Sequence, residues 1–132
     1  MITSDALPVV HNFKTIQRRD KFLGVSFDIY DDTDTAYNLA GCTAKMQVRE
    51  KPGGPVVLEF SSANNTIVFE TDGLQPVVNR LRLVERSESV MDIPGAFPVP
   101  KKYRYDIQIN SPTYGTQTFF AGEFPVLDDI TV

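Results

Sequence analysis

Acidic side chains gather in one short stretch of the sequence, where a calcium site would need them. The stretch contains Asp28, Asp31, Asp32 and Asp34. A calcium-binding EF-hand loop needs oxygen ligands at alternate positions, a glycine at position 6 and a glutamate at position 12. Counted from Asp32, the fifth and sixth positions are Ala36 and Tyr37, so the pattern fails. We interpret the stretch as a solvated loop and expect no metal ion.

The residue types that perform catalysis are sparse. His11 is the only histidine, so a zinc site or a Ser-His-Asp triad would lack partners. Asp106 and Glu123 could act as a glycosidase pair, but both lie in strand-like sequence that predicts surface positions. The segment 52–55, Pro-Gly-Gly-Pro, is typical of a hairpin turn. It does not match a phosphate-binding loop, in which a lysine and a helix would follow the glycines. We expect no enzymatic activity, no catalytic residue and no cofactor.

The strongest strand pattern lies in residues 103–126. Aromatic and β-branched residues alternate with polar ones from Tyr103 to Ile109, which is the period of a β-strand with one buried face. Residues 110–115 supply asparagine, serine, proline and glycine for a turn. The next alternating face is formed by Thr118, Phe120, Gly122, Phe124 and Val126. Together the two runs predict a long β-hairpin.

Shorter runs of the same period recur along the chain, separated by turn residues. They lie at 22–30, 42–50, 56–60, 67–69 and 79–84, and the second contains the single cysteine, Cys42. No segment keeps a helical period, so the sequence predicts an all-β fold: an antiparallel β-sandwich of about seven strands, with a closed barrel as the alternative. The residues expected to form its core are Leu23, Val25, Phe27, Met46, Val48, Leu58, Leu81, Leu83, Tyr105, Ile107, Phe120 and Phe124.

Length and charge limit the possible partners. The 132 residues suffice for one domain with its own core. A net charge of −4 and scattered basic residues argue against a nucleic-acid partner. The sequence shows no signal-peptide pattern and no apolar run of the roughly 18 residues that a membrane span needs. We therefore expect synthesis in the cytoplasm, without a membrane partner.

Two segments contain apolar residues without a strand pattern. Residues 1–20 are expected to form an N-terminal arm or first strand ahead of a sandwich domain at 21–132, and residues 93–100 contain too many prolines for regular structure. We expect the apolar side chains of such segments to be covered by another protein chain. The candidate partner-contact residues are Leu7, Val9, Val10, Phe13, Ile16, Ile93, Phe97 and Val99.

Three motifs in order resemble small structural proteins of tailed phages and prophages. Residues 37–49, YNLAGCTAKMQVR, are similar to a "DLTGxTxxxQVR" segment that precedes a Pro/Gly turn in that group. Residues 103–109, YRYDIQI, match its "YxYDIxI" strand, and residues 121–132 are similar to its closing "xxxGxFxVxxDVT" segment. The resemblance covers roughly residues 20–132.

The resemblance implies an immunoglobulin-like sandwich similar to the N-terminal domains of baseplate and fibre-attachment proteins. It implies a structural role in the virion, without enzymatic activity, in a particle assembled in the host cytoplasm. The implied partners are other virion structural proteins, with the chain itself forming a homo-oligomer or ring. A carbohydrate- or receptor-binding sandwich is the alternative, for which Phe97, Tyr114 and Phe119 are the aromatic candidates. A small enzyme is a third possibility, which the missing catalytic groups disfavour.

Overall fold

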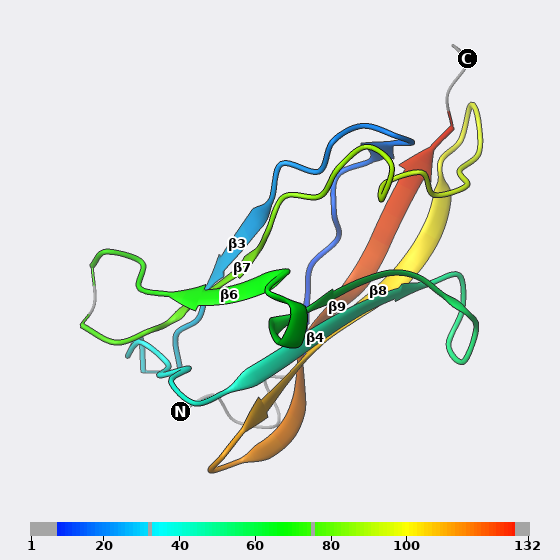
Figure 1. Cartoon of the computed structure of the whole chain (residues 1–132). Coiled ribbons are helices and arrows are strands. Elements are labelled where there is room, and N and C mark those ends of the chain that lie inside the picture. Colours follow the sequence, from blue (N-terminus) through cyan, green and yellow to red (C-terminus); the bar gives the residue numbers. More distant parts are fainter. Residues whose placement is uncertain (1–7, 32, 75, 129–132) are drawn as a thin grey trace.

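The computed structural model describes residues 8–31, 33–74 and 76–128, which form two β-sheets and no α-helix (Figure 1). The larger sheet has the order β1-β9-β8-β4-β5, with β2 also paired to β9, and the smaller has the order β3-β7-β6. The larger sheet comprises β1 (Val9–Val10), β2 (Ile16–Gln17), β4 (Thr43–Arg49), β5 (Val56–Ser61), β8 (Lys101–Ser111) and β9 (Gly115–Leu127). The smaller sheet comprises β3 (Val25–Asp28), β6 (Ile67–Glu70) and β7 (Arg80–Leu83).

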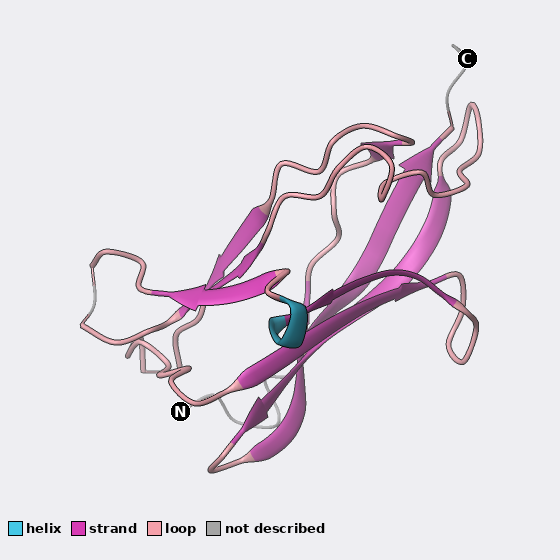
Figure 2. Cartoon of the chain, in the orientation of Figure 1, coloured by secondary structure: helices cyan, strands magenta, loops and turns pink. Residues whose placement is uncertain are grey.

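This arrangement is all-β and sandwich-like, as the sequence predicts. Neighbouring strands are antiparallel, except that β1 and β2 run parallel to β9. The one helical element in the described residues is a short 3-10 turn, η2 (Ser62–Asn64), between β5 and β6 (Figure 2).

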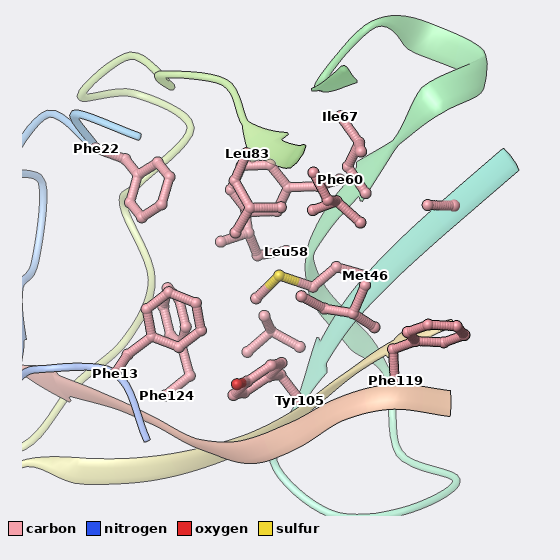
Figure 3. Close-up of a cluster of buried hydrophobic side chains, with 14 of the residues drawn as sticks. Phe13, Phe22, Met46, Leu58, Phe60, Ile67, Leu83, Tyr105, Phe119 and Phe124 are labelled. Atoms are coloured by element: carbon pink, nitrogen blue, oxygen red, sulfur yellow. The ribbon is translucent and has the colours of Figure 1, made fainter. Parts of the chain in front are cut away.

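The core lies between the two sheets because the strands other than β1 turn apolar side chains inward, whereas both valines of β1 are exposed. Figure 3 shows side chains from both sheets, including Leu83 of β7 and Tyr105 of β8, in one interior. Most of the expected core is confirmed as buried: Met46, Val48, Leu58, Leu81, Leu83, Tyr105, Ile107 and Phe124. Val25, Phe27 and Phe120 are partly buried and pack against this core.

The long hairpin of β8 and β9 exists, but a β-bulge shifts its alternation. Ile107 lies opposite Phe120, whereas Gln108 lies opposite Thr118, so Phe119 is the extra residue. Phe119 is buried together with the inner face, and Thr118 lies on the outer face across from Gln108. The expectation that Thr118 shares the face of Phe120 is therefore wrong, because the inserted residue reverses the alternation before it.

The strand expected at residues 22–30 is shorter, and its first part faces the other way. Leu23 is 81% exposed while its neighbour Phe22 is buried, so the prediction that Leu23 belongs to the core is wrong. Gly24 has a φ of 96°, a left-handed conformation that breaks the alternation between Phe22 and Val25. Cys42 also lies outside its expected strand, immediately before β4, where it is partly buried.

Candidate partner-binding surface

The N-terminal arm, residues 8–20 in the described chain, lies along the edge of the larger sheet. Val9 pairs with Phe120 in β1, and Ile16 pairs with Val126 in β2. Between them, the His11 N–H donates to the Ala121 carbonyl at 3.0 Å, and the Phe13 N–H donates to the Glu123 carbonyl at 3.0 Å. The arm therefore continues the sheet past β9.

Side chains from the centre of the sheet hold the arm in place. The Tyr105 hydroxyl donates to the His11 carbonyl oxygen at 2.5 Å, and burial raises the pKa of Tyr105. Gly122 lies opposite Tyr105, and a Cβ atom at Gly122 would come within 2.1 Å of the same carbonyl oxygen. The Phe13 ring packs against Tyr105 at 4.9 Å and Phe124 at 5.1 Å between ring centroids. Only a glycine at position 122 allows the arm to approach this closely.

The proline-rich loop, residues 93–100, is anchored beside the end of β9. The Tyr103 hydroxyl donates to the Pro94 carbonyl oxygen at 2.5 Å. The Asp128 N–H donates to the Ala96 carbonyl at 3.0 Å, and Ala96 bridges to Leu127. The first part of the loop is thus fixed to the sheet, while Phe97 and Val99 beyond it are exposed.

The arm contacts the residues just before the proline-rich loop, near the end of β9. The Arg19 N–H donates to the Met91 carbonyl at 3.0 Å. The Arg18 guanidinium lies between Asp92, at 2.7 Å, and Asp128, at 3.2 Å. The hydrogen bond with Asp92 raises the pKa of Arg18. Both segments with candidate contact residues are therefore connected to the same end of the sheet.

The candidate contact residues divide into covered and exposed side chains. Phe13 and Ile93 are buried in the core, and Ile16 is partly buried against it, so the chain itself covers them. Leu7 lies outside the described residues. The exposed candidates are Val9, Val10, Phe97 and Val99, of which Val10 is 74% and Phe97 57% exposed.

A groove that the sequence did not indicate lies between the arm and the segment entering β3. Its volume is about 490 Å³, and its apolar lining includes Phe13, Ile16, Phe22 and Val25. The His11 ring also lines it, in edge contact with Phe13 and Phe27 at 5.2 Å each between ring centroids. The groove depends on the path of the arm, which pairs with residues more than a hundred positions away.

Asp106 and Glu123 are not directly paired across the hairpin. Asp106 lies opposite Ala121 and Glu123 lies opposite Arg104, so the two carboxylates are diagonal neighbours on the outer face of the sheet. No group of three potential metal ligands occurs among the described residues. No helix in the described part of the chain has the length and apolar character to cross a membrane.

Comparison with known proteins gives no relative from which to transfer a function. The sequence matches no protein-family model, and no curated protein shows significant similarity to it.

Proposed function

We propose that this protein is a non-enzymatic structural component of a tailed-phage virion. It acts through contacts with other virion proteins, as a decoration or connector at the head, neck, tail or baseplate. The phage-like motifs support this proposal, because their strand segments form three adjacent strands, β4, β8 and β9, at the centre of the larger sheet. Motifs scattered along the sequence thus belong to one continuous structural unit.

The strand order supports the proposal that the sandwich is immunoglobulin-like. In that fold, one sheet contains strands A, B, E and D, and the other contains strands C, F and G. Here the smaller sheet has the order β3-β7-β6, which matches B, E and D, and the larger contains β4, β8 and β9, which match C, F and G in chain order. The N-terminal strands β1 and β2 differ from strand A, because they pair with β9 of the larger sheet. The hydroxyl of Tyr103, near the start of β8, donates a hydrogen bond to the main-chain carbonyl of Pro94 upstream in the chain. The tyrosine corner at the start of strand F makes the same kind of bond to upstream backbone.

The observation that carries the proposed role is the exposed apolar edge of the larger sheet. β1 is the end strand of that sheet in the described chain, and its side chains Val9 and Val10 are exposed. An edge strand with apolar side chains is a template for pairing with another chain. Phe97 and Val99 add exposed apolar surface on the proline-rich loop. Repeated copies in a ring would cover these side chains in the particle.

Mass-spectrometric counting of purified particles tests this role. We expect the protein in particles at a copy number that is a multiple of a ring symmetry. Val10→Asp and Phe97→Ser should lower incorporation, because each places a polar group where a neighbour makes apolar contact. Leu74→Asp is the matched control, since Leu74 is exposed in the β6–β7 connection and belongs to neither segment.

Two results would contradict the proposed role. The first is particles that lack the protein. The second is equal incorporation of all three variants, which would remove the proposed surface from assembly. Light scattering with size-exclusion chromatography on each variant verifies that the substitution leaves a folded protein.

A carbohydrate- or receptor-binding sandwich is the second candidate function. Phe119 is buried in the core and cannot serve as a surface platform. Phe97 lies beside one end of the β8–β9 hairpin, and Tyr114 lies in the turn at the other end, so they do not share a site. Tyr114 is 48% exposed and lines a polar pocket, and this observation supports a carbohydrate- or receptor-binding function.

A further inference from the structure

A polar pocket of about 330 Å³ lies at the end of the sandwich that carries the β8–β9 turn. Two parts of the chain form it: residues 31, 36–38 and 40, from the connection between β3 and β4, and residues 111–114, at the end of β8 and in the turn before β9. The first segment contributes Tyr37 and Asn38, and the second contributes Ser111, Thr113 and Tyr114.

Tyr37 provides a fixed hydroxyl group in this pocket. The residue is only 8% exposed, and its ring packs edge-on against Phe119 at 5.5 Å between centroids. Within the described chain the Tyr37 hydroxyl has no hydrogen-bond partner. Every fully buried side-chain oxygen of the described residues does have such a partner, so the Tyr37 hydroxyl is not fully buried. The hydroxyl must therefore reach the pocket surface. Burial raises the pKa of Tyr37, and the neighbouring Cys42 and Tyr114 raise it further, so the group stays protonated and can donate.

The groups around Tyr37 are held by local hydrogen bonds. The Asn38 side-chain oxygen accepts from the Ala40 N–H at 3.0 Å, which leaves the two amide N–H groups of Asn38 available as donors. The Ser111 hydroxyl oxygen accepts from the N–H groups of Thr113 and Tyr114, at 3.1 and 3.3 Å. The turn that presents the Tyr114 ring is thus already ordered, which lowers the entropy lost when a ligand binds.

The pocket lining selects a neutral ligand. No lysine, arginine or histidine occurs among the described lining residues, and Asp31 is the one charged residue there. A phosphate or carboxylate would find no basic side chain among these described residues, whereas hydroxyl groups match the tyrosine, asparagine and threonine groups. Binding loops built from tyrosine, serine and asparagine combine aromatic contact area with adaptable hydrogen bonds.

We propose that this pocket binds a neutral saccharide, with the Tyr114 ring against a sugar face and Tyr37 and Asn38 bonded to sugar hydroxyl groups. A peptide is less suited, because the pocket lies between two connecting segments and offers no free strand edge along which a peptide could add. The saccharide site is independent of the particle role, so either can fail alone.

Amide NMR titration of the full-length protein tests the site. The probes are glucose, galactose, rhamnose and N-acetylglucosamine with their short oligomers, and the comparison ligands are inorganic phosphate and a capped neutral peptide. We expect at least one saccharide to shift the amide resonances of residues 37, 38, 111, 113 and 114, while phosphate and peptide leave them unchanged.

Substitutions then separate binding from folding. Tyr37→Phe removes one hydrogen bond but keeps the packed ring, and should weaken saccharide binding about two- to tenfold. Tyr114→Ala should weaken it on the order of tenfold through lost ring contact. Tyr114→Leu retains apolar bulk without the aromatic ring and serves if the alanine variant unfolds. Phe97→Ala, at the opposite end of the hairpin, should leave the affinity unchanged.

Three outcomes would overturn the saccharide assignment. One is the absence of shifts with every saccharide. Another is shifts at these residues with the peptide alone, which would make the pocket a protein contact. The third is a saccharide affinity that neither Tyr37→Phe nor the Tyr114 variants change, which would place binding elsewhere.

Discussion

The hydroxyl group of Tyr105 donates a hydrogen bond to the main-chain carbonyl of His11, at 2.5 Å and across 94 residues of sequence. Tyr103, on the same face of β8, makes the corresponding bond to the carbonyl of Pro94. One strand at the centre of the larger sheet therefore positions both the arm and the proline-rich loop. The surfaces proposed to contact neighbouring proteins are fixed by the core beneath them.

Tyr105→Phe should loosen the arm without disturbing the ring packing beneath it. The lost hydrogen bond should cost about 1 kcal/mol in the free energy of unfolding. Amide exchange should accelerate at His11 and Phe13, whose N–H groups bond to β9. Tyr103→Phe is the control, because it should affect residues 94–96 while leaving the arm protected. Equal exchange of the arm in both variants would show that the Tyr105 hydrogen bond does not hold it.

Gly122→Ala should displace the arm more severely. The new Cβ atom would lie 2.1 Å from the His11 carbonyl oxygen, so one of the two backbones must move. We expect destabilisation on the order of 1–3 kcal/mol in urea titration, with exchange protection lost at His11. Thr118→Ala, on the outer face of the same strand, should stay within about 0.5 kcal/mol of the parent. Full protection of His11 in Gly122→Ala would contradict this close approach.

Period-two alternation predicted the central strands, because each has one wet face and one buried face. Met46 and Val48 of β4 and Tyr105 and Ile107 of β8 face the core as that pattern requires. It failed where the backbone departs from regular strand geometry. The extra residue Phe119 reverses the alternation of faces in the first part of β9. Phenylalanine and threonine can occupy either face of a strand, so the residue types alone do not indicate this reversal.

The pairing of the arm with β9 and the two pockets could not be predicted from local sequence. Val9 and Ile16 lie beside β9 through hydrogen bonds between main-chain groups, which any residue except proline can form. The pocket at Tyr37 requires a loop and a turn far apart in the chain to meet. The sequence indicates Tyr114 as a candidate surface aromatic residue, whereas Tyr37 and Asn38 begin the phage-like motif and nothing in that motif indicates a binding role.

Adjacent substitutions at 22 and 23 test the facing of the segment that enters β3. Phe22→Ala should cost about 3–5 kcal/mol, because the ring is buried against Phe60 at 5.3 Å between centroids. Leu23→Ala should change stability by less than about 0.5 kcal/mol, because that side chain is exposed. Chemical denaturation of both variants measures the difference. A larger loss in Leu23→Ala than in Phe22→Ala would invert the facing.

The thiol of Cys42 should make stability fall at alkaline pH. Burial raises its pKa, although a hydrogen bond from Ser111 partly offsets this. In the unfolded protein the thiol ionises near its ordinary pKa of about 8.5, which is lower than its pKa in the folded protein. The contribution of the neutral thiol to the free energy of unfolding is therefore complete below the unfolded pKa. It is lost as the pH rises through the folded pKa. The difference in the free energy of unfolding between the parent and Cys42→Ser measures this contribution, because the other groups that titrate at alkaline pH are the same in both proteins.

Thiol labelling provides the independent check on Cys42. The pH midpoint for labelling the native protein should lie above that for the protein unfolded in urea. Coincident midpoints, or a stability difference that does not change with pH, would show that folding leaves this thiol unperturbed.

The parallel alignment of β1 and β2 with β9 gives the fold a particular response to mechanical load. Val9 lies beside Phe120 and Gln17 lies beside Leu127, so both strands advance in the same direction along the edge of the sheet. Tension applied ahead of Val9 and beyond Leu127 would draw the two strands past each other in shear. The hydrogen bonds between them would then bear the force together and would not open one after another. A protein held at both ends inside an assembly would thus resist extension through the same contacts that position its arm.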